Sequence, residues 1–530
     1  MIKLLAIAAI LLGISSGQGV AGSPIAVEVI ATIGPWPAVS ALIGYRGRLW
    51  FANSVRYPDH NSADIYSLDP ATGGHRFERH LFSQDVGLPV VADGMLYWPY
   101  EDSRASMRWG HIAVTNGNEW QLRVMSGSAR MYHVHAMEKL GGRLYAAPSA
   151  WRAGLHVSSD GGQSWRQIYD YPTPKGHITR IISLASFNGK LFGAVVHRRT
   201  AAPRYPLLML EGETVAEVPG WPDTARALDL VAARGGVYGL IRDAGKVAFW
   251  YTDGKIVERI ADAGSMPPLS AFTADKRGFW GVSDSALWHS RSGRRWRRVQ
   301  KLTGGRPIDI EIYRGQIYVG GAGSDGRGIL WGPPPSASLE KPASSAPTWP
   351  PQRTKVVDWD AARGKLRDAI AEPNTYRTQL RNLVYGYAMA GPPPGFFEAA
   401  LALQFPDRKI GTFGGRSKRP AGNVGRHILL WGMGVAGRGR VPGVLLDRPW
   451  TQVSNRPQKW FDSFPMALFA VSWTRQRDSA TLARLIARLD RTSDPLWLKG
   501  DIIGALSAAT GKRFGYDFDA WRRWWAMQGK

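Results

Sequence analysis

The sequence of 530 residues contains no cysteine. Disulfide bonds, thiolate metal sites, a cysteine nucleophile and a lipid-modified N-terminal cysteine are therefore excluded. Long apolar runs are also missing beyond the first residues, since no later stretch approaches about eighteen uninterrupted apolar residues. We therefore expect a soluble mature chain without a transmembrane anchor.

The first residues, MIKLLAIAAILLGISSGQGVAGS, combine Lys3, an apolar run from Leu4 to Ile14 and small residues around Ala21. This pattern is typical of a cleavable secretory signal, which we expect at residues 1–22. The alternative is an uncleaved N-terminal anchor, although the run is short for a membrane-spanning helix. The signal predicts export to the periplasm or the extracellular space, and an exported chain without disulfides is typical of a bacterial envelope protein.

Acidic residues are few, with 42 Asp and Glu against 67 Lys and Arg, so the formal net charge is +25. Residues 351–530 hold 29 Lys and Arg against 14 Asp and Glu, which places about +15 of the charge in the last third. In an exported protein this excess favours an acidic glycan, an anionic envelope polymer or a lipid surface as partner, and not nucleic acid. The alternative is an evenly solvated basic surface.

A repeat of two strands joined by a Gly-containing turn occurs seven times, and the second strand of each copy opens on an aromatic residue. These residues are Trp50, Tyr97, Tyr145, Phe192, Tyr238, Trp280 and Tyr318, separated by 47, 48, 47, 46, 42 and 38 residues. Such periods are typical of four-stranded propeller blades. The sequence therefore predicts a seven-bladed β-propeller at residues 24–332.

The stretch HVSSDGGQSW contains Ser158, Asp160, Gly162 and Trp165. Their spacing resembles the Asp box (BNR repeat) of sialidase-like propellers. The resemblance implies a turn between the third and fourth strands of a blade, with a structural role for these four residues. The segments TNGNEW and SRSGRRW keep the Gly-x-x-Trp spacing without the Asp.

The seventh blade is one strand short, because only GILWG remains between Tyr318 and a proline-rich stretch. The segment IAVEVIATIG at 25–34 precedes the first blade and can supply the missing outer strand. We expect this strand to close the ring and to remove its exposed edges.

Residues 333–353 are rich in Pro, Ser and Ala and predict an extended linker. Beyond it, at 354–530, apolar residues recur with helical spacing, so the fold class is multidomain: an all-β propeller followed by an all-α domain. Asp519, before AWRRWWAM, is the expected N-cap of the last helix. The last 35 residues or so resemble the end of bacterial HEAT-like repeats, which implies a helix that ends at Thr510 and a cap formed by Trp521, Trp524 and Trp525. Such stacks bind proteins or act as spacers, which makes a protein partner the expectation for this domain.

Twelve residues before each aromatic, near the start of each innermost strand, stand Ala38, Asp85, His133, Arg180, Arg226, Pro268 and Arg306. Inner strands line the channel of a propeller, so these side chains are expected to meet at its mouth. His135 shares a strand face with His133, and Asp309 and Glu311 share another. Arginine forks bind carboxylate, sulfate or phosphate, which makes Asp85, His133, His135, Arg180, Arg226 and Arg306 candidate ligand-binding residues. The alternative is a self-paired polar network without a ligand.

A sialidase would need an arginine triad, a Tyr–Glu pair and an Asp acid, usually with an Arg-Ile-Pro motif in the first blade. No Arg-Ile-Pro occurs, and no Tyr–Glu pair can be identified. Catalytic residues therefore stay unknown, and neither a metal nor a cofactor is expected, because no ligand motif or phosphate loop occurs. We expect a non-enzymatic recognition or scaffold protein, with a glycan-acting hydrolase or lyase that uses Asp85 as its acid as the alternative.

Overall fold

The computed structural model describes residues 27–528 except for 56–62, 104–108, 126–130, 201–202, 244–245, 263, 337–344, 352–354, 372–375, 412–417 and 448–462. The predicted signal at 1–22, residues 24–26 and parts of the predicted linker lie outside the described residues. Within them, no helix is long and apolar enough to cross a membrane.

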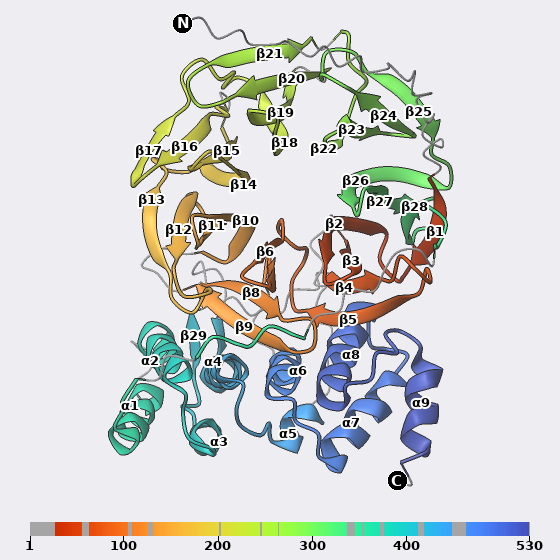
Figure 1. The fold of residues 1–530 in the computed structure, drawn as a ribbon. Helices are drawn as coiled ribbons and strands as arrows, with labels where there is room; N and C mark the ends of the chain where they lie inside the picture. Colours follow the sequence, from red (N-terminus) through yellow and green to blue (C-terminus); the bar gives the residue numbers. More distant parts are fainter. Residues whose placement is uncertain are drawn as a thin grey trace, which may run out of the picture.

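Seven four-stranded sheets form a ring in the described part of the chain, which confirms the predicted propeller (Figure 1). Each blade runs from its innermost to its outermost strand. Blades 1 to 3 are β2 (Ala38–Tyr45), β3 (Arg48–Ser54), β4 (Ala63–Leu68) and β5 (His75–Leu81); β6 (Val90–Ala92), β7 (Met95–Pro99), β8 (Gly110–Thr115) and β9 (Trp120–Met125); and β10 (His133–Leu140), β11 (Arg143–Ser149), β12 (Gly154–Ser158) and β13 (Arg166–Asp170).

Blades 4 to 6 continue the ring. They are β14 (Ile178–Phe187), β15 (Lys190–Arg198), β16 (Leu207–Glu211) and β17 (Thr214–Glu217); β18 (Arg226–Ala233), β19 (Gly236–Asp243), β20 (Lys246–Thr252) and β21 (Val257–Ala261); and β22 (Ala271–Asp275), β23 (Gly278–Ser283), β24 (Ala286–Ser290) and β25 (Arg297–Lys301).

Blade 7 is completed by the N-terminal strand. It holds β26 (Gly305–Tyr313), β27 (Gln316–Gly323) and β28 (Gly328–Gly332), and β1 (Glu28–Ile33) pairs antiparallel with β28. The predicted closing strand is therefore confirmed. The two ends of the ring are joined by main-chain hydrogen bonds, which cover the outer edge of β28.

The aromatic repeat has a simple structural cause. Each of the seven aromatics is the third residue of the second strand of its blade and is buried. The turn before that strand contains glycine, as at Gly47 and Gly189, whose φ angles of 77° and 75° suit a tight hairpin. The aromatic side chains thus fill the core between neighbouring blades.

The second domain contains α1 (Trp359–Ala371), α2 (Tyr376–Ala390), α3 (Phe396–Leu401), α4 (Ala421–Ala436), α5 (Gly443–Leu446), α6 (Ser463–Thr474), α7 (Ser479–Leu489), α8 (Leu496–Thr510) and α9 (Phe518–Ala526). Helices α2, α4, α6 and α8 form a row beside the propeller, and the others form a second row behind it (Figure 1). The predicted helical domain after the propeller is therefore confirmed. A short hairpin, β29 (Lys409–Gly411) and β30 (Lys418–Pro420), interrupts the helical pattern.

The end of the chain follows the prediction with one correction. Helix α8 ends at Thr510 before Gly511, whose φ of 72° closes the helix, and Trp521 is fully buried against Phe514. Asp519 is not the N-cap of α9. The cap is Asp517, whose carboxylate accepts a hydrogen bond from Ala520 N, because the helix starts two residues earlier than the sequence pattern suggested.

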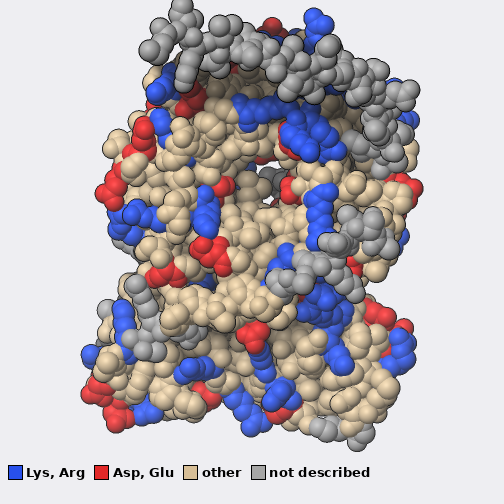
Figure 2. Space-filling view, in the orientation of Figure 1, with Lys and Arg blue, Asp and Glu red and all other residues tan. Residues whose placement is uncertain are grey.

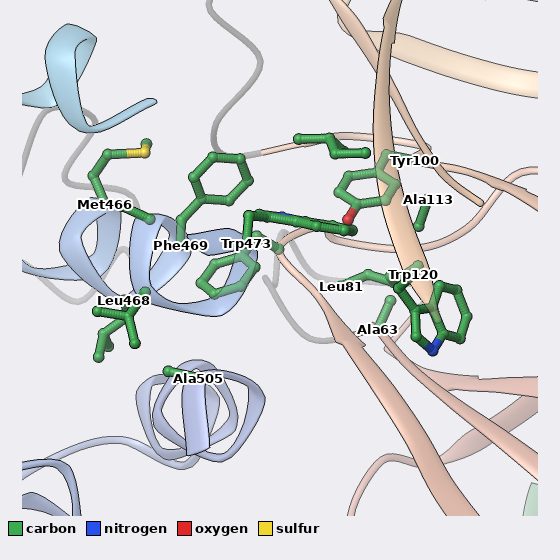
Figure 3. Close-up of a cluster of buried hydrophobic side chains, with 14 of the residues drawn as sticks. Ala63, Leu81, Tyr100, Ala113, Trp120, Met466, Leu468, Phe469, Trp473 and Ala505 are labelled. Atoms are coloured by element: carbon green, nitrogen blue, oxygen red, sulfur yellow. The ribbon is translucent and has the colours of Figure 1, made fainter. Parts of the chain in front are cut away.

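The helical domain is docked on blades 1 and 2 through one continuous hydrophobic core. Phe82 packs edge-to-face on Phe469 at 5.3 Å, and the Arg79 guanidinium lies 4.0 Å from the Trp473 ring. Figure 3 shows Phe469 and Trp473 of α6 facing Tyr100 of the propeller. Arg79 also donates to the Ser472 carbonyl at 3.1 Å. The helices are therefore part of the same folded body as the propeller.

The predicted linker is also anchored where it is described, at 333–336 and 345–351. The Trp349 indole N–H donates to Glu119 at 3.1 Å, and the Pro347 carbonyl accepts from Asn116 at 3.1 Å. Residues 345–351 thus pack along the propeller while keeping the non-helical conformation that the composition predicted.

Candidate functional site

A cavity of about 630 Å³ lies at the end of the ring where the innermost strands begin. All six predicted ligand-binding residues line it: Asp85, His133, His135, Arg180, Arg226 and Arg306. Both basic and acidic side chains lie around the central opening of the ring in Figure 2. The spacing along the sequence therefore selected residues that the fold brings together.

Blades 1 and 6 contribute differently from the prediction. Ala38 and Pro268 do not line the cavity, and Ser40, Ala41, Ser270 and Ala271 do. In β2 a bulge after Ser40 shifts the register, and Ala41 takes a φ of 54°. The inner strand of blade 6, β22, is short and begins only at Ala271, so Pro268 precedes it.

Blade 2 supplies an acidic side through a loop. Asp85 lies between β5 and β6, in a segment that pairs with the residues after β7, where Glu101 N donates to the Asp85 carbonyl at 3.1 Å. The Asp85 carboxylate accepts from Ser54 Oγ at 2.6 Å and from Val86 N at 2.9 Å. This pairing brings Glu101 and Asp102 to the mouth, two residues that the sequence pattern did not reveal.

Glu101 joins this acidic side to blades 3 and 4. Arg180 Nη1 lies 3.4 Å from Glu101 Oε1, and Nδ1 of His133 lies 3.7 Å from the same oxygen. The rings of His133 and His135 stack with centroids 5.4 Å apart, and His135 Nε2 lies 2.8 Å from Ser149 Oγ. Burial, with Arg180 next in effect, lowers the pKa of His133 to about 3 and that of His135 well below its usual range. Both imidazoles are therefore neutral at neutral pH.

The basic side comes from blades 4, 5 and 7. Arg198, Arg226, Arg242 and Arg306 line the cavity together with Arg180. Arg242 is the direct partner of Arg226 in the β18–β19 pairing. Arg198 and Arg242 were missed, although a signal existed: the partner of an inner-strand residue in an antiparallel hairpin reaches the same end of the blade.

A second layer of carboxyl groups lies deeper in the channel. Asp229 and Asp309 line the cavity, and each follows a bulge in its inner strand. Asp309 accepts from Leu42 N at 3.0 Å. Burial and the nearby Asp309 raise the pKa of Asp229 to about 7 and that of Glu311 to about 8. Asp229 is thus a carboxyl group that exchanges a proton near neutral pH.

The turn at 158–165 lies at the other end of blade 3. Ser158 is level with Leu144, which pairs with Lys139, far down β10 from His133. Asp160 accepts from Ser164 N at 2.9 Å, and the Trp165 indole donates to the Gly162 carbonyl at 3.0 Å. None of these residues lines the cavity. The turn is a structural element that packs against blade 2.

Another cavity, of about 700 Å³, lies between blade 2 and the ends of α2, α4 and α6. Its lining includes Arg438 and Arg475. Carbonyl groups at helix C-termini carry partial negative charge, which these side chains offset. This cavity is part of the interface between the two domains.

Comparisons with known proteins bear on the fold alone. No protein-family model matches the chain, and a search of curated proteins finds no match. Among solved structures, the WD40 domain of Neurospora crassa Pan2 is similar at 11% identity with a TM-score of 0.41, over 61% of this chain and 96% of that one. YCF48 bound to D1 peptide is similar at 13% identity and a TM-score of 0.39, over 58% and 94%. A Trypanosoma rangeli sialidase mutant with trans-sialidase activity is similar at 13% and 0.33, over 57% and 59%.

Proposed function

We propose that this chain is an exported recognition protein that binds an anionic group of an acidic glycan or envelope polymer at the channel mouth. The observation that carries the proposal is the convergence of five arginines from three blades on one cavity. Guanidinium groups bind carboxylate, sulfate and phosphate with paired hydrogen bonds. The cavity of about 630 Å³ is also within the usual size range of ligand pockets.

The remaining parts of the proposal rest on other features. Export rests on the composition of residues 1–22. A protein partner is proposed for the outer row of helices, because the inner row is used against the propeller. The 158–165 turn is proposed as an Asp box, since Asp160 and Trp165 make the local hydrogen bonds that such a hairpin needs.

Binding to an array of acidic glycans and anionic polymers tests the proposal. We expect the Arg226→Ala/Arg306→Ala variant to bind at least about tenfold more weakly, because two charge-assisted contacts are removed. Arg297→Ala is the matched control, since this exposed arginine lies on the outer strand β25, outside the cavity. If the Arg226→Ala/Arg306→Ala variant binds these ligands as tightly as the wild type, the proposal is refuted.

A glycan-acting hydrolase is the second candidate, and one observation favours it. A general acid must hold its proton near neutral pH, and Asp229, with a pKa of about 7, fits this role better than Asp85, which the sequence suggested. However, the described residues that line the cavity include no tyrosine. The Tyr171 hydroxyl, 3.4 Å from Glu217, lies outside it, and burial followed by the charge of Glu217 raises the pKa of Tyr171 to about 12.

Fluorogenic sialosides and other acidic glycosides separate the two candidates. We expect no turnover above buffer. If the wild type hydrolyses one of these substrates and Asp229→Asn abolishes that turnover, the function is hydrolysis and not recognition.

A further inference from the structure

The cavity between blade 2 and the helical domain is lined by charge of one sign. Its basic residues are Arg123, Lys355, Arg438 and Arg475, and no aspartate or glutamate of the described chain lines it. None of these four side chains forms an ion pair within the ranges that the structure describes. Lys355, Arg438 and Arg475 are exposed, so the cavity opens to solvent.

The ends of three helices offset part of this positive charge. Helices α2, α4 and α6 end at Ala390, Ala436 and Thr474, beside the cavity and next to β9 (Figure 1). Each helix C-terminus carries about half a negative charge, so the three ends supply roughly −1.5. An excess of about 2.5 positive charges remains along the lining. Such an excess attracts an anion into the cavity.

Arg123 is the buried cation of this lining. It lies on β9, is 7% exposed and makes no hydrogen bond to another residue in the described part of the chain. Its guanidinium carbon lies 5.8 Å from the centre of the Trp349 ring. Burial lowers the pKa of Arg123, and the charges of Tyr97 and Asp160 oppose this effect only in part. Because a buried cation without an ion pair costs stability, folding alone does not explain an arginine here.

Aromatic and small residues complete the lining. Trp120, Tyr385 and Trp473 contribute rings, and a Cβ at Gly386 would meet no atom within 4 Å. The volume of about 700 Å³ is within the usual range of small-molecule pockets, which often lie between domains. The cavity therefore suits a ligand that combines an anionic group with a ring.

We propose that this interdomain cavity binds a small organic anion with a six-membered ring. Arg123 and Arg438 would hold the anionic group, and Trp120 and Trp473 would contact the ring. The site is separate from the channel mouth and does not rest on the function proposed there. Two sources share this chemistry: an aromatic acid, and a sugar that carries a carboxylate or a phosphate.

The 158–165 turn gains a role from this proposal. Gln163 and Ser164 line the cavity, although none of the four residues that define the turn reaches the channel mouth. Ser164 Oγ donates to Asp160 at 2.6 Å, and Gln163 Nε2 donates to the Asp160 carbonyl at 3.2 Å. Asp160 therefore positions two polar side chains in the wall of the proposed site.

Equilibrium dialysis with matched probes tests the proposal. The aromatic arm uses benzoate, phenyl phosphate and neutral benzamide, and the sugar arm uses glucuronate, a hexose phosphate and neutral glucose. Acetate is the anion without a ring. In at least one arm we expect an anion to bind at least about tenfold more tightly than both its neutral analogue and acetate, because the charge and the ring each contribute. The arm that shows this preference identifies the source.

Arg123→Met tests the buried cation. We expect the preferred anion to bind at least about tenfold more weakly, because a charge-assisted contact is lost. The melting temperature should equal or exceed that of the wild type, because an unpaired buried charge is removed. A lower melting temperature with unchanged affinity would show that Arg123 is structural and would overturn the assignment.

Gly386→Leu fills the cavity without changing its charge. Leucine favours helix more than glycine does, so α2 is expected to stay folded. We expect this variant to bind the preferred anion at least about tenfold more weakly than the wild type. Gly364→Leu is the matched control, because this α1 position is equally open and lies outside the cavity.

The same dialysis on the Arg226→Ala/Arg306→Ala variant separates the two proposed sites. If this variant loses the anions while Gly386→Leu keeps them, they bind at the channel mouth, and the interdomain site is refuted while the proposed function stands. If no anion binds more tightly than its neutral analogue, the interdomain site is refuted as well. Binding that survives in the arginine variant and is lost in Gly386→Leu is the result we expect.

Discussion

Nε2 of His80 lies 2.9 Å from Oδ1 of Asp501, while Nδ1 of the same ring lies 2.7 Å from Oδ1 of Asp64. All three side chains are fully buried. Asp64 and His80 belong to blade 1, and Asp501 belongs to α8. Burial alone would lower the pKa of His80, but the hydrogen bonds to Asp501 and Asp64 outweigh it and raise the pKa. A buried hydrogen-bonded bridge that favours the protonated imidazole therefore joins the propeller to the helical domain.

Replacing Asp501 by alanine should weaken this joint. The change leaves the buried His80 without one of its partners, and breaking a buried ion pair costs about 3–5 kcal/mol of unfolding free energy. Urea unfolding measures the change in unfolding free energy, with limited proteolysis of the helical domain as the readout. Asp490→Ala, which removes an exposed ion pair with Arg522, is the control and should change stability by less than about 1 kcal/mol. Equal effects of the two changes would contradict the prediction.

The same bridge should depend on pH in a defined direction. Because the folded pKa of His80 is raised, its contribution to stability is fully present below about pH 6.5 and is lost as the pH rises through the folded value. The stability difference between wild type and His80→Gln should therefore be larger at pH 6 than at pH 9. Thermal unfolding of both proteins across this range gives the comparison, and a difference that grows with pH would be inconsistent with a protonated bridge.

Asp229→Asn should change how stability varies with pH. The folded protein keeps the Asp229 proton up to about pH 7, whereas the unfolded chain releases it near pH 4. Wild-type stability thus falls through this window by roughly 1.4 kcal/mol for each pH unit, and the variant lacks that loss. Denaturant unfolding at pH 5 and pH 8 should show the variant gaining relative to wild type at the higher pH. If the unfolding free energies of wild type and variant change in parallel between pH 5 and pH 8, Asp229 is already ionised in the folded protein and the prediction is wrong.

Deletion of residues 24–34 should open the ring. It removes β1, whose main chain pairs with β28 from Glu28 to Ile33, and so exposes an edge. We expect the shortened protein to be less stable to heat, as measured by calorimetry. We also expect it to self-associate through the exposed edge, as measured by light scattering. A synthetic peptide of residues 27–34 should restore stability, and a scrambled peptide should not. Unchanged unfolding of the deleted protein would refute the closing role.

Trp165→Ala should destabilise the protein without affecting ligand binding. Trp165 is 8% exposed and packs between blades 2 and 3, so its loss should cost about 3–5 kcal/mol. The turn lies at the far end of the blade from His133, so affinity at the channel mouth should stay within about twofold of wild type. Unfolding and binding measured on the same preparation check both parts, and a large loss of affinity would show that the turn reaches the site.

The ring and most of the site could be predicted because both follow from a local repeat. Trp50 and its six counterparts occupy equivalent positions in the seven blades. Counting back the same number of residues from each of them therefore also identifies cavity residues such as Arg180 and Arg306. Glu101 reaches the mouth through a loop that pairs only in the folded chain, and no period marks it. The docking of the helices was hidden for a similar reason, because isolated polar residues such as His80 look like surface positions until their partners are known.

The bridge at Asp64 links two distant parts of the chain. The carboxylate of Asp64 accepts a hydrogen bond from Tyr516, which is 452 positions further along the chain. Synthesis runs from the N-terminus, and domains generally begin to fold from the N-terminal side, so blade 1 is made long before its partners on the helical side. We therefore expect the buried polar contacts of blade 1 to be completed only after these helices have been made. A chain truncated before α8 would lack the partners that Asp501 and Tyr516 give to His80 and Asp64.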